Sequence, residues 1–149
     1  MKLEKGQTSK KDIAVITEDM GDRSVLFTIS KEVVDRDGDI LRASGVDFTN
    51  FMKNPVFLSF HNSRDFPLGK VTKFWVEGDK VKAIVYFPTL EELSSDPKYA
   101  SEKARLVDFC YFCYKTGMLN AVSVGFIPLE RCYRRQHNIR FHQRKICRS

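Results

Sequence analysis

Two residues of the chain, His61 and Ser123, have the side chains of a serine-nucleophile site. A hydroxyl is a poor nucleophile until a neighbouring base takes its proton, and a neutral imidazole is the side chain suited to that task near pH 7. The residue types alone are a weak signal, because the chain has three histidines and several serines, and such residues more often serve as ordinary polar side chains. The pair is informative only if the surrounding elements bring the two side chains together.

Ser123 lies in a short apolar run, 121–126, that has the pattern of a β-strand. Alternation along a strand places its large apolar residues on one face: Val122, Val124 and Phe126. Ser123 then lies on the other face between two small residues, Ala121 and Gly125. Small neighbours leave room for a substrate to approach the hydroxyl.

His61 ends a second apolar run, 55–61, which is also predicted to be a strand. Val56, Leu58 and Phe60 share one face of that strand. His61 lies on the other face, at the mouth of a polar loop over 62–65. A histidine in that position can reach outward from the strand.

Two antiparallel strand pairs are predicted around these runs. Strands over 13–17 and 24–34 are separated by a turn signal at 21–22. Strands over 67–76 and 80–87 are joined by a glycine-containing turn, which is the strongest hairpin signal in the sequence.

One long helix is predicted over 98–116, because Asp96 and Pro97 form a typical helix start and Gly117 a typical end. A short helical turn is predicted over 47–53. Strands on both sides of one long helix predict an α+β domain with a mainly antiparallel, barrel-like sheet, in which the strands that hold the histidine and the serine pair. A chain of 149 residues is long enough for one such domain.

Five motifs follow one another along the chain. They are Val34 to Ile40 (VDRDGDI), Asn50 to Val56 (NFMKNPV), the strand that ends at His61, Pro67 to Val71 (PLGKV) and Ala121 to Phe126 (AVSVGF). In this order they resemble the prohead proteases of tailed phages, which are serine proteases of capsid maturation with a fold similar to that of the herpesvirus assemblins. The resemblance runs from about Ile16 to Leu129.

The resemblance implies that His61 is the general base and Ser123 the nucleophile. It implies an assemblin-like fold, and it implies that the substrates are the major capsid protein, its scaffold segment and the protease itself. Cleavage would then take place inside the assembling prohead, in the cytoplasm of the host bacterium. Self-association stays open as a further property of the chain.

The third member of a catalytic triad is harder to assign. In the resembled family the chain continues into further apolar strands, one of which carries an acidic residue or, in assemblins, a second histidine. Glu130 is a poor candidate, because seven residues of extended strand place it about 23 Å from Ser123 and on the opposite face. His142, on the polar side of 139–142, is the predicted third member.

The net charge of +6 comes entirely from the end of the chain. Residues 131–149 hold seven basic side chains and no acid, whereas the first 130 residues hold 18 basic and 19 acidic side chains. A basic end can bind phosphate, but such a run is more often a solvated terminus, so nucleic acid is not an expected partner.

Three segments follow from these observations: a flexible N-terminus over 1–10, a prohead protease-like domain over 11–130 and a basic, divergent tail over 131–149. The abrupt change of composition at Arg131 indicates a truncated or frame-shifted prophage gene, in which case the fold is incomplete at its C-terminus. The alternative function is then a catalytically inactive capsid-assembly or scaffolding protein.

No cofactor, metal or membrane segment is predicted. No apolar stretch of about 18 residues is present, so the protein is expected to be soluble. Cys110 and Cys113 with His137 and His142 do not have zinc-finger spacing, and all four cysteines are expected to be reduced. The acidic cluster over 35–39 lacks the glycine position and the late glutamate of a calcium loop, which favours a turn.

Overall fold

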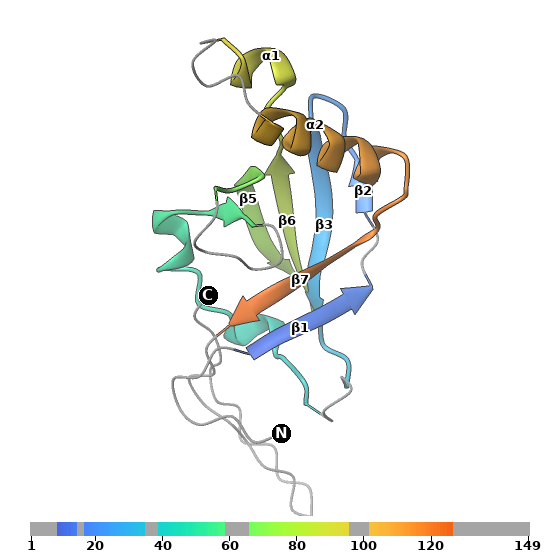
Figure 1. Ribbon diagram of the computed structural model, residues 1–149. Coiled ribbons are helices and arrows are strands. Elements are labelled where there is room, and N and C mark those ends of the chain that lie inside the picture. Colours follow the sequence, from blue (N-terminus) through green and yellow to red (C-terminus); the bar gives the residue numbers. More distant parts are fainter. Residues whose placement is uncertain (1–8, 15–16, 35–38, 59–65, 96–101, 127–149) are drawn as a thin grey trace, which may run out of the picture.

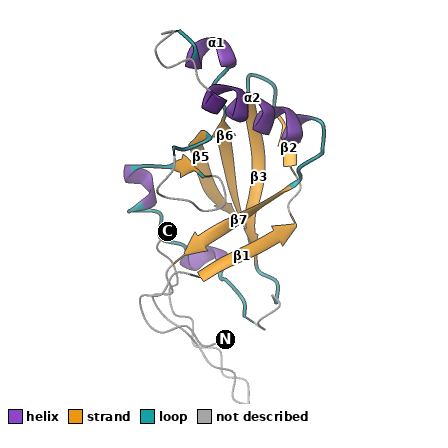
Figure 2. Cartoon of the chain, viewed as in Figure 1, coloured by secondary structure: helices purple, strands orange, loops and turns teal. Residues whose placement is uncertain are grey.

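The computed structural model describes residues 9–14, 17–34, 39–58, 66–95 and 102–126. These residues form two antiparallel β-sheets and a small number of helices (Figure 1, Figure 2). The predicted α+β class with mainly antiparallel strands is therefore confirmed. One sheet pairs β1 with β7, and the other has five strands in the order β2-β3-β6-β5-β4.

Short strands make up most of the regular structure. The strands are β1 Ser9–Ala14, β2 Thr17–Asp19, β3 Ser24–Lys31, β4 Val56–Phe57, β5 Gly69–Glu77, β6 Lys80–Tyr86 and β7 Ala121–Phe126. The helices are the 3-10 turns η1 Ala43–Gly45 and η2 Phe51–Lys53, followed by α1 Leu90–Leu93 and α2 Glu102–Lys115.

The core lies between the five-stranded sheet and α2, which runs across one end of β3 and β6 (Figure 1). Strand β6 alternates strictly, with Val81, Ala83 and Val85 buried. Strand β3 loses its alternation at a bulge between Thr28 and Ser30, where the register with β6 shifts. From the helix, the core receives Ala104, Val107, Tyr111, Cys113 and Tyr114.

The strongest predicted hairpin is confirmed in β5 and β6. Glu77 pairs with Lys80 across a two-residue turn, and Gly78 at its first position has a φ of +60°. A positive φ there is the backbone of a type II′ turn, which matches the twist of the two strands. The hairpin is readable from sequence because the turn chemistry is entirely local.

The other predicted pair is correct in its turn and wrong in one of its strands. The hairpin at Gly21 joins β3 to Thr17–Asp19, not to a strand over 13–17. Ile13 belongs instead to β1, which pairs with β7 more than a hundred residues later. Strand β1 begins at Ser9, two residues before the predicted domain boundary.

The predicted helices are present with different bounds. Helix α2 is described from Glu102 and ends before Gly117, whose φ of +77° is the left-handed conformation of a helix end. The predicted turn over 47–53 is the 3-10 turn η2. Helix α1 was not predicted, although Thr89 and Glu92 form a capping box at its start.

Arg23 fixes α2 to the sheet. Its guanidinium donates a hydrogen bond of 2.7 Å to Asp108 on the helix and others to the carbonyls of Phe87 and Pro88 at the end of β6. It also lies 4.2 Å from the ring centre of Tyr111. Charge-assisted hydrogen bonds together with a cation–π contact hold the helix in one position over the sheet.

Gly69 is required where β5 passes close to β6. A Cβ at this position would lie 2.8 Å from the Tyr86 carbonyl oxygen and 2.9 Å from a methyl group of Val85. Because a backbone atom cannot move aside as a side chain can, we expect Gly69→Ala to lower the free energy of unfolding by about 2 kcal/mol. Chemical denaturation measures this loss, and an unchanged midpoint would contradict it.

Candidate active site

Ser123 lies in the middle of β7, and its backbone position is described. All six residues of β7 pair with β1, and the register sets Ser123 directly opposite Asp12. On an antiparallel ladder, directly opposed residues share one face of the sheet. Asp12 and Ser123 therefore lie on the same face, with Lys10 and Ala14 at the diagonal positions.

Val122 marks the opposite face of β7. It is partly buried and packs against the main hydrophobic core, and it pairs with Ile13 of β1. Because side chains alternate along a strand, Ser123 lies on the face that does not carry this contact. The predicted strand is thus confirmed.

The strand that leads to His61 is shorter than predicted and pairs elsewhere. Strand β4 covers only Val56–Phe57 and pairs with β5 at the edge of the five-stranded sheet. Direct pairing between this segment and the Ser123 strand is wrong for the described residues, because β4 pairs with β5 in one sheet and β7 pairs with β1 in the other. His61 itself lies outside the described residues.

Tyr114 on α2 nevertheless connects the two segments. Its hydroxyl donates a hydrogen bond of 3.0 Å to the carbonyl oxygen of Ala121, the first residue of β7. Its ring lies edge-on to Phe57 of β4, with 6.1 Å between ring centres. Residue 61 is at most about 14 Å of chain beyond Phe57, and residue 123 is about 7 Å beyond Ala121. The segment that leads to His61 and the segment that leads to Ser123 therefore both begin at a residue in contact with Tyr114.

The phenol of Tyr114 is kept protonated. Burial first, and then the neighbouring thiols of Cys110 and Cys113, raise the pKa of Tyr114 well above its ordinary value. A protonated phenol is a hydrogen-bond donor, which is the role that the Ala121 carbonyl requires. Tyr114 thus positions the beginning of the serine strand.

We expect Tyr114→Phe to lower the free energy of unfolding by about 1 kcal/mol, the usual contribution of one such hydrogen bond. Thermal unfolding measures this loss, and an unchanged melting temperature would contradict it. Tyr111→Phe is the matched comparison, because Tyr111 donates a comparable hydrogen bond to Asp19, away from β7, and its loss is expected to lower stability by a similar amount.

Asp12 is the functional candidate that the sequence reasoning missed. The resembled family places its acidic group on a strand after the serine, whereas β1 comes from the beginning of the chain. The alternation of Asp12 with Lys11 and Ile13 carries no local sign of a partner strand. His142, the predicted third member, lies outside the described residues.

The cysteines of α2 lie in or against the hydrophobic core. Cys113 is buried, and burial together with the neighbouring Cys113 raises the pKa of Cys110 to about 11. Among the described residues, no group of three or more His, Cys, Asp or Glu side chains could hold a metal ion. The histidines of the zinc-like pattern, His137 and His142, lie outside these residues, as does most of the acidic cluster over 35–39.

The raised pKa of Cys110 predicts slow alkylation. The thiolate is the reactive form, and a pKa near 11 leaves it about a hundredfold less populated at pH 8 than in an ordinary free cysteine. Iodoacetamide labelling of the folded protein, followed by peptide mapping, measures the rate at this position. Labelling of Cys110 as fast as in the urea-unfolded protein would contradict the expectation.

No protein-family model, curated protein or solved structure matches the chain. Within the segments that the structure describes, none of the helices has both the length and the apolar character needed to cross a membrane.

Proposed function

We propose that the chain is a serine endopeptidase of phage capsid maturation, with Ser123 as the nucleophile and His61 as the general base. The proposal starts from the resemblance of its five ordered motifs to prohead proteases. The observation that carries it further is the position of Tyr114, which contacts both Phe57 and Ala121. Two segments distant in sequence thus approach each other, as a shared active site requires.

The proposed reaction is acyl transfer. His61 takes the proton of the Ser123 hydroxyl, and the oxygen attacks a peptide carbonyl of the substrate chain. The protonated imidazole then gives its proton to the leaving amine, which leaves an acyl group on the serine. Water, activated by the same imidazole, releases the acyl group and restores the free serine.

Asp12 is the third member that we favour over His142. The register places it directly opposite Ser123, and opposed Cα atoms of an antiparallel pair are separated by about 5 Å. In the proposed triad, the Asp12 carboxylate stabilises the imidazolium of His61 that forms during the reaction. The acidic group then comes from β1, which precedes the five-stranded sheet in the chain, and not from a strand after Ser123.

An assemblin-like barrel is part of the same proposal. Strand β7 contacts β3 of the five-stranded sheet, and β1 also approaches β3. The two sheets are therefore neighbours, which supports an assemblin-like barrel in which β1 and β7 continue the larger sheet.

The proposed substrates are the major capsid protein, its scaffold segment and the protease itself, within the prohead. Covalent labelling tests the nucleophile directly. The full chain is treated with a serine-directed phosphonate and the labelled peptide is identified, with Ser123→Ala as the control. We expect the label on Ser123 and its loss in the control. Labelling of another serine, or none at high probe concentration, would instead favour an inactive assembly or scaffolding protein.

A further inference from the structure

Strand β5 is much longer than the strand that covers its outer edge. Strand β4 pairs only with Gly69 and Lys70, and the Pro55 carbonyl accepts one further hydrogen bond from the Val71 amide. The chain enters this strand directly from η2, so no residue before Pro55 continues the ladder along β5. Within the described part of the chain, the backbone of residues 72–77 hydrogen-bonds only to β6. We call residues 72–77 the β5 edge.

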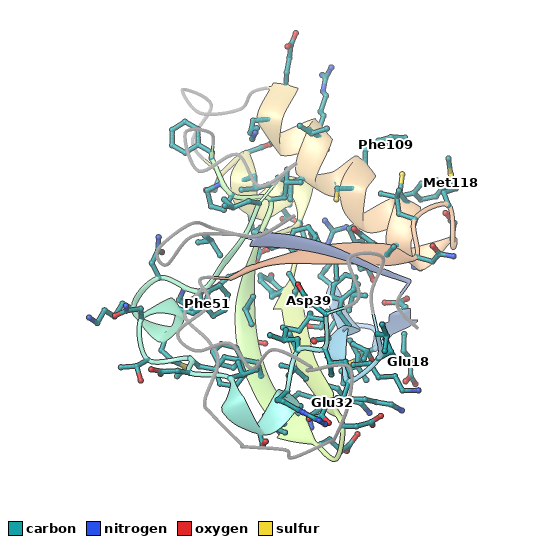
Figure 3. All side chains as sticks on the ribbon, turned by 90° about the horizontal axis from the view of Figure 1, so that it is seen from below. Glu18, Glu32, Asp39, Phe51, Phe109 and Met118 are labelled. Atoms are coloured by element: carbon teal, nitrogen blue, oxygen red, sulfur yellow. The ribbon has the colours of Figure 1, made fainter. Side chains whose placement is uncertain are left out.

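The β5 edge is long enough to receive another strand. Its length is that of a typical whole β-strand, and an open edge presents N–H and C=O groups that can bond to an added strand. Aromatic rings lie beside it on the core side of the sheet: Phe48 and Phe51 contact Phe74, with 4.3 and 5.2 Å between ring centres. Figure 3 shows Phe51 between η2 and the yellow-green strands. An added strand would therefore find apolar side chains on one of its two faces.

The other face of the β5 edge is basic. Residues 66–76 include two exposed lysines, Lys70 and Lys73, and no acidic side chain. The acid at the end of the strand, Glu77, is already in an ion pair with a lysine of β6. The ammonium nitrogen of Lys73 lies 4.7 Å from the ring centre of Trp75, so a cation–π contact holds this charge on the strand. A positive charge is thus fixed beside the open edge without an acid to neutralise it on residues 66–76.

We infer that the β5 edge binds an extended, acidic segment of a partner protein as an added β-strand, antiparallel to β5 in continuation of β4. In this mode of recognition, main-chain hydrogen bonds supply affinity and side chains at alternate positions supply specificity. Carboxylates on the solvent-facing side of the added strand would lie beside Lys73, and cross-strand pairs of opposite charge stabilise a sheet. The inference does not depend on the proposed protease activity, because it uses neither Ser123 nor His61.

The same charge disfavours a second copy of this chain at the β5 edge. Two β5 strands paired edge to edge about a two-fold axis would bring the lysines of both copies onto one face of a continuous sheet. Like charges on neighbouring strands destabilise the pairing, and a lysine on an exposed edge is a common protection against it. An acidic strand turns this repulsion into attraction, which is why we assign the edge to an acidic partner.

The fluorescence of Trp75 tests the inference, because this residue lies in the β5 edge and is the single tryptophan of the chain. The full chain is titrated with a peptide of about eight residues that alternates glutamate with valine. We expect a saturable change of emission with a dissociation constant on the order of 10 to 100 µM, and at least about tenfold weaker binding in the Lys73→Glu variant. If this variant does not fold by circular dichroism, Lys73→Gln replaces it.

Lys31→Glu is the matched control for the charge change. Lys31 is also exposed, but it lies at the end of β3, with β6 between it and β5. Its replacement is expected to leave the dissociation constant within about twofold of that of the unchanged chain, because its charge lies two strands from the edge. Absence of binding by the unchanged chain, or an equal loss in both variants, would overturn the inference.

Backbone methylation separates strand addition from simple charge attraction. An added strand bonds to β5 through every second amide, so the peptide N-methylated at one alternate set of amides should bind and the peptide methylated at the other set should not. Equal affinity of the two methylated peptides would overturn the strand addition.

Hydrogen exchange tests the other possible occupants of the β5 edge. Amides of 72–77 that point away from β6 should exchange fast in the free chain and slowly with the glutamate–valine peptide bound. Slow exchange that increases with protein concentration would show a second copy at the edge. Slow exchange at every concentration would show that another segment of the same chain occupies it. Either result would overturn the inference.

Discussion

Cleavage of the major capsid protein is expected to fall by at least about 10⁴-fold when Ser123 is replaced by alanine. In the proposed reaction the oxygen of the Ser123 hydroxyl forms the acyl bond, so its removal eliminates the covalent step. Its strand is held by backbone pairing with β1 and by the Tyr114 hydrogen bond to Ala121, and neither involves the serine hydroxyl. The fold should therefore be retained, and co-expression with the capsid protein followed by electrophoresis measures the loss.

Ser30→Ala is the matched control for this substitution. Ser30 lies on β3, is buried, and its hydroxyl has no hydrogen-bond partner among the described residues. Removal of an unpaired buried hydroxyl is expected to leave stability equal or slightly higher, and the rate unchanged. Normal capsid cleavage by the Ser123→Ala variant would reject the serine as nucleophile, whatever the control shows.

The parts of the fold that the sequence predicted are those specified by neighbouring residues. The β5–β6 hairpin follows from one glycine turn between two alternating runs, and the end of α2 follows from Gly117. The pairing of β1 with β7 has no such local source, because the two strands are separated by the whole five-stranded sheet in sequence. Only the folded backbone reveals which strand lies beside the serine.

The candidate site also has a part that neighbouring residues specify and a part that depends on long-range contacts. The strand that holds Ser123 is predictable from its own residues, and the structure contains it as β7. Tyr114 was not predicted, because a tyrosine on an apolar helix stripe gives no sign that its hydroxyl reaches a strand. Asp12 was missed for a related reason, since its position opposite Ser123 depends on the strand register and not on any nearby motif.

Asp12→Asn is expected to lower the cleavage rate by about 10³- to 10⁴-fold, the usual effect of removing the acidic member of a triad. Asparagine keeps the size of the side chain and removes its charge. Without the carboxylate, the imidazolium of His61 is less stabilised, so the acid limb of the pH–rate profile should also move to lower pH. A residue that only supported the fold would not move this limb.

Two further variants decide between the candidates for the third member. Lys10→Gln changes a charge at a diagonal position of the same sheet face and is expected to leave the pH profile in place. His142→Ala is expected to have little effect on the rate, since in the proposed triad the Asp12 carboxylate stabilises the imidazolium. If His142→Ala instead abolishes cleavage while Asp12→Asn retains it, Asp12 has no catalytic role and the triad is Ser-His-His. We expect the first outcome, because the register between β1 and β7 sets residue 12 directly opposite residue 123.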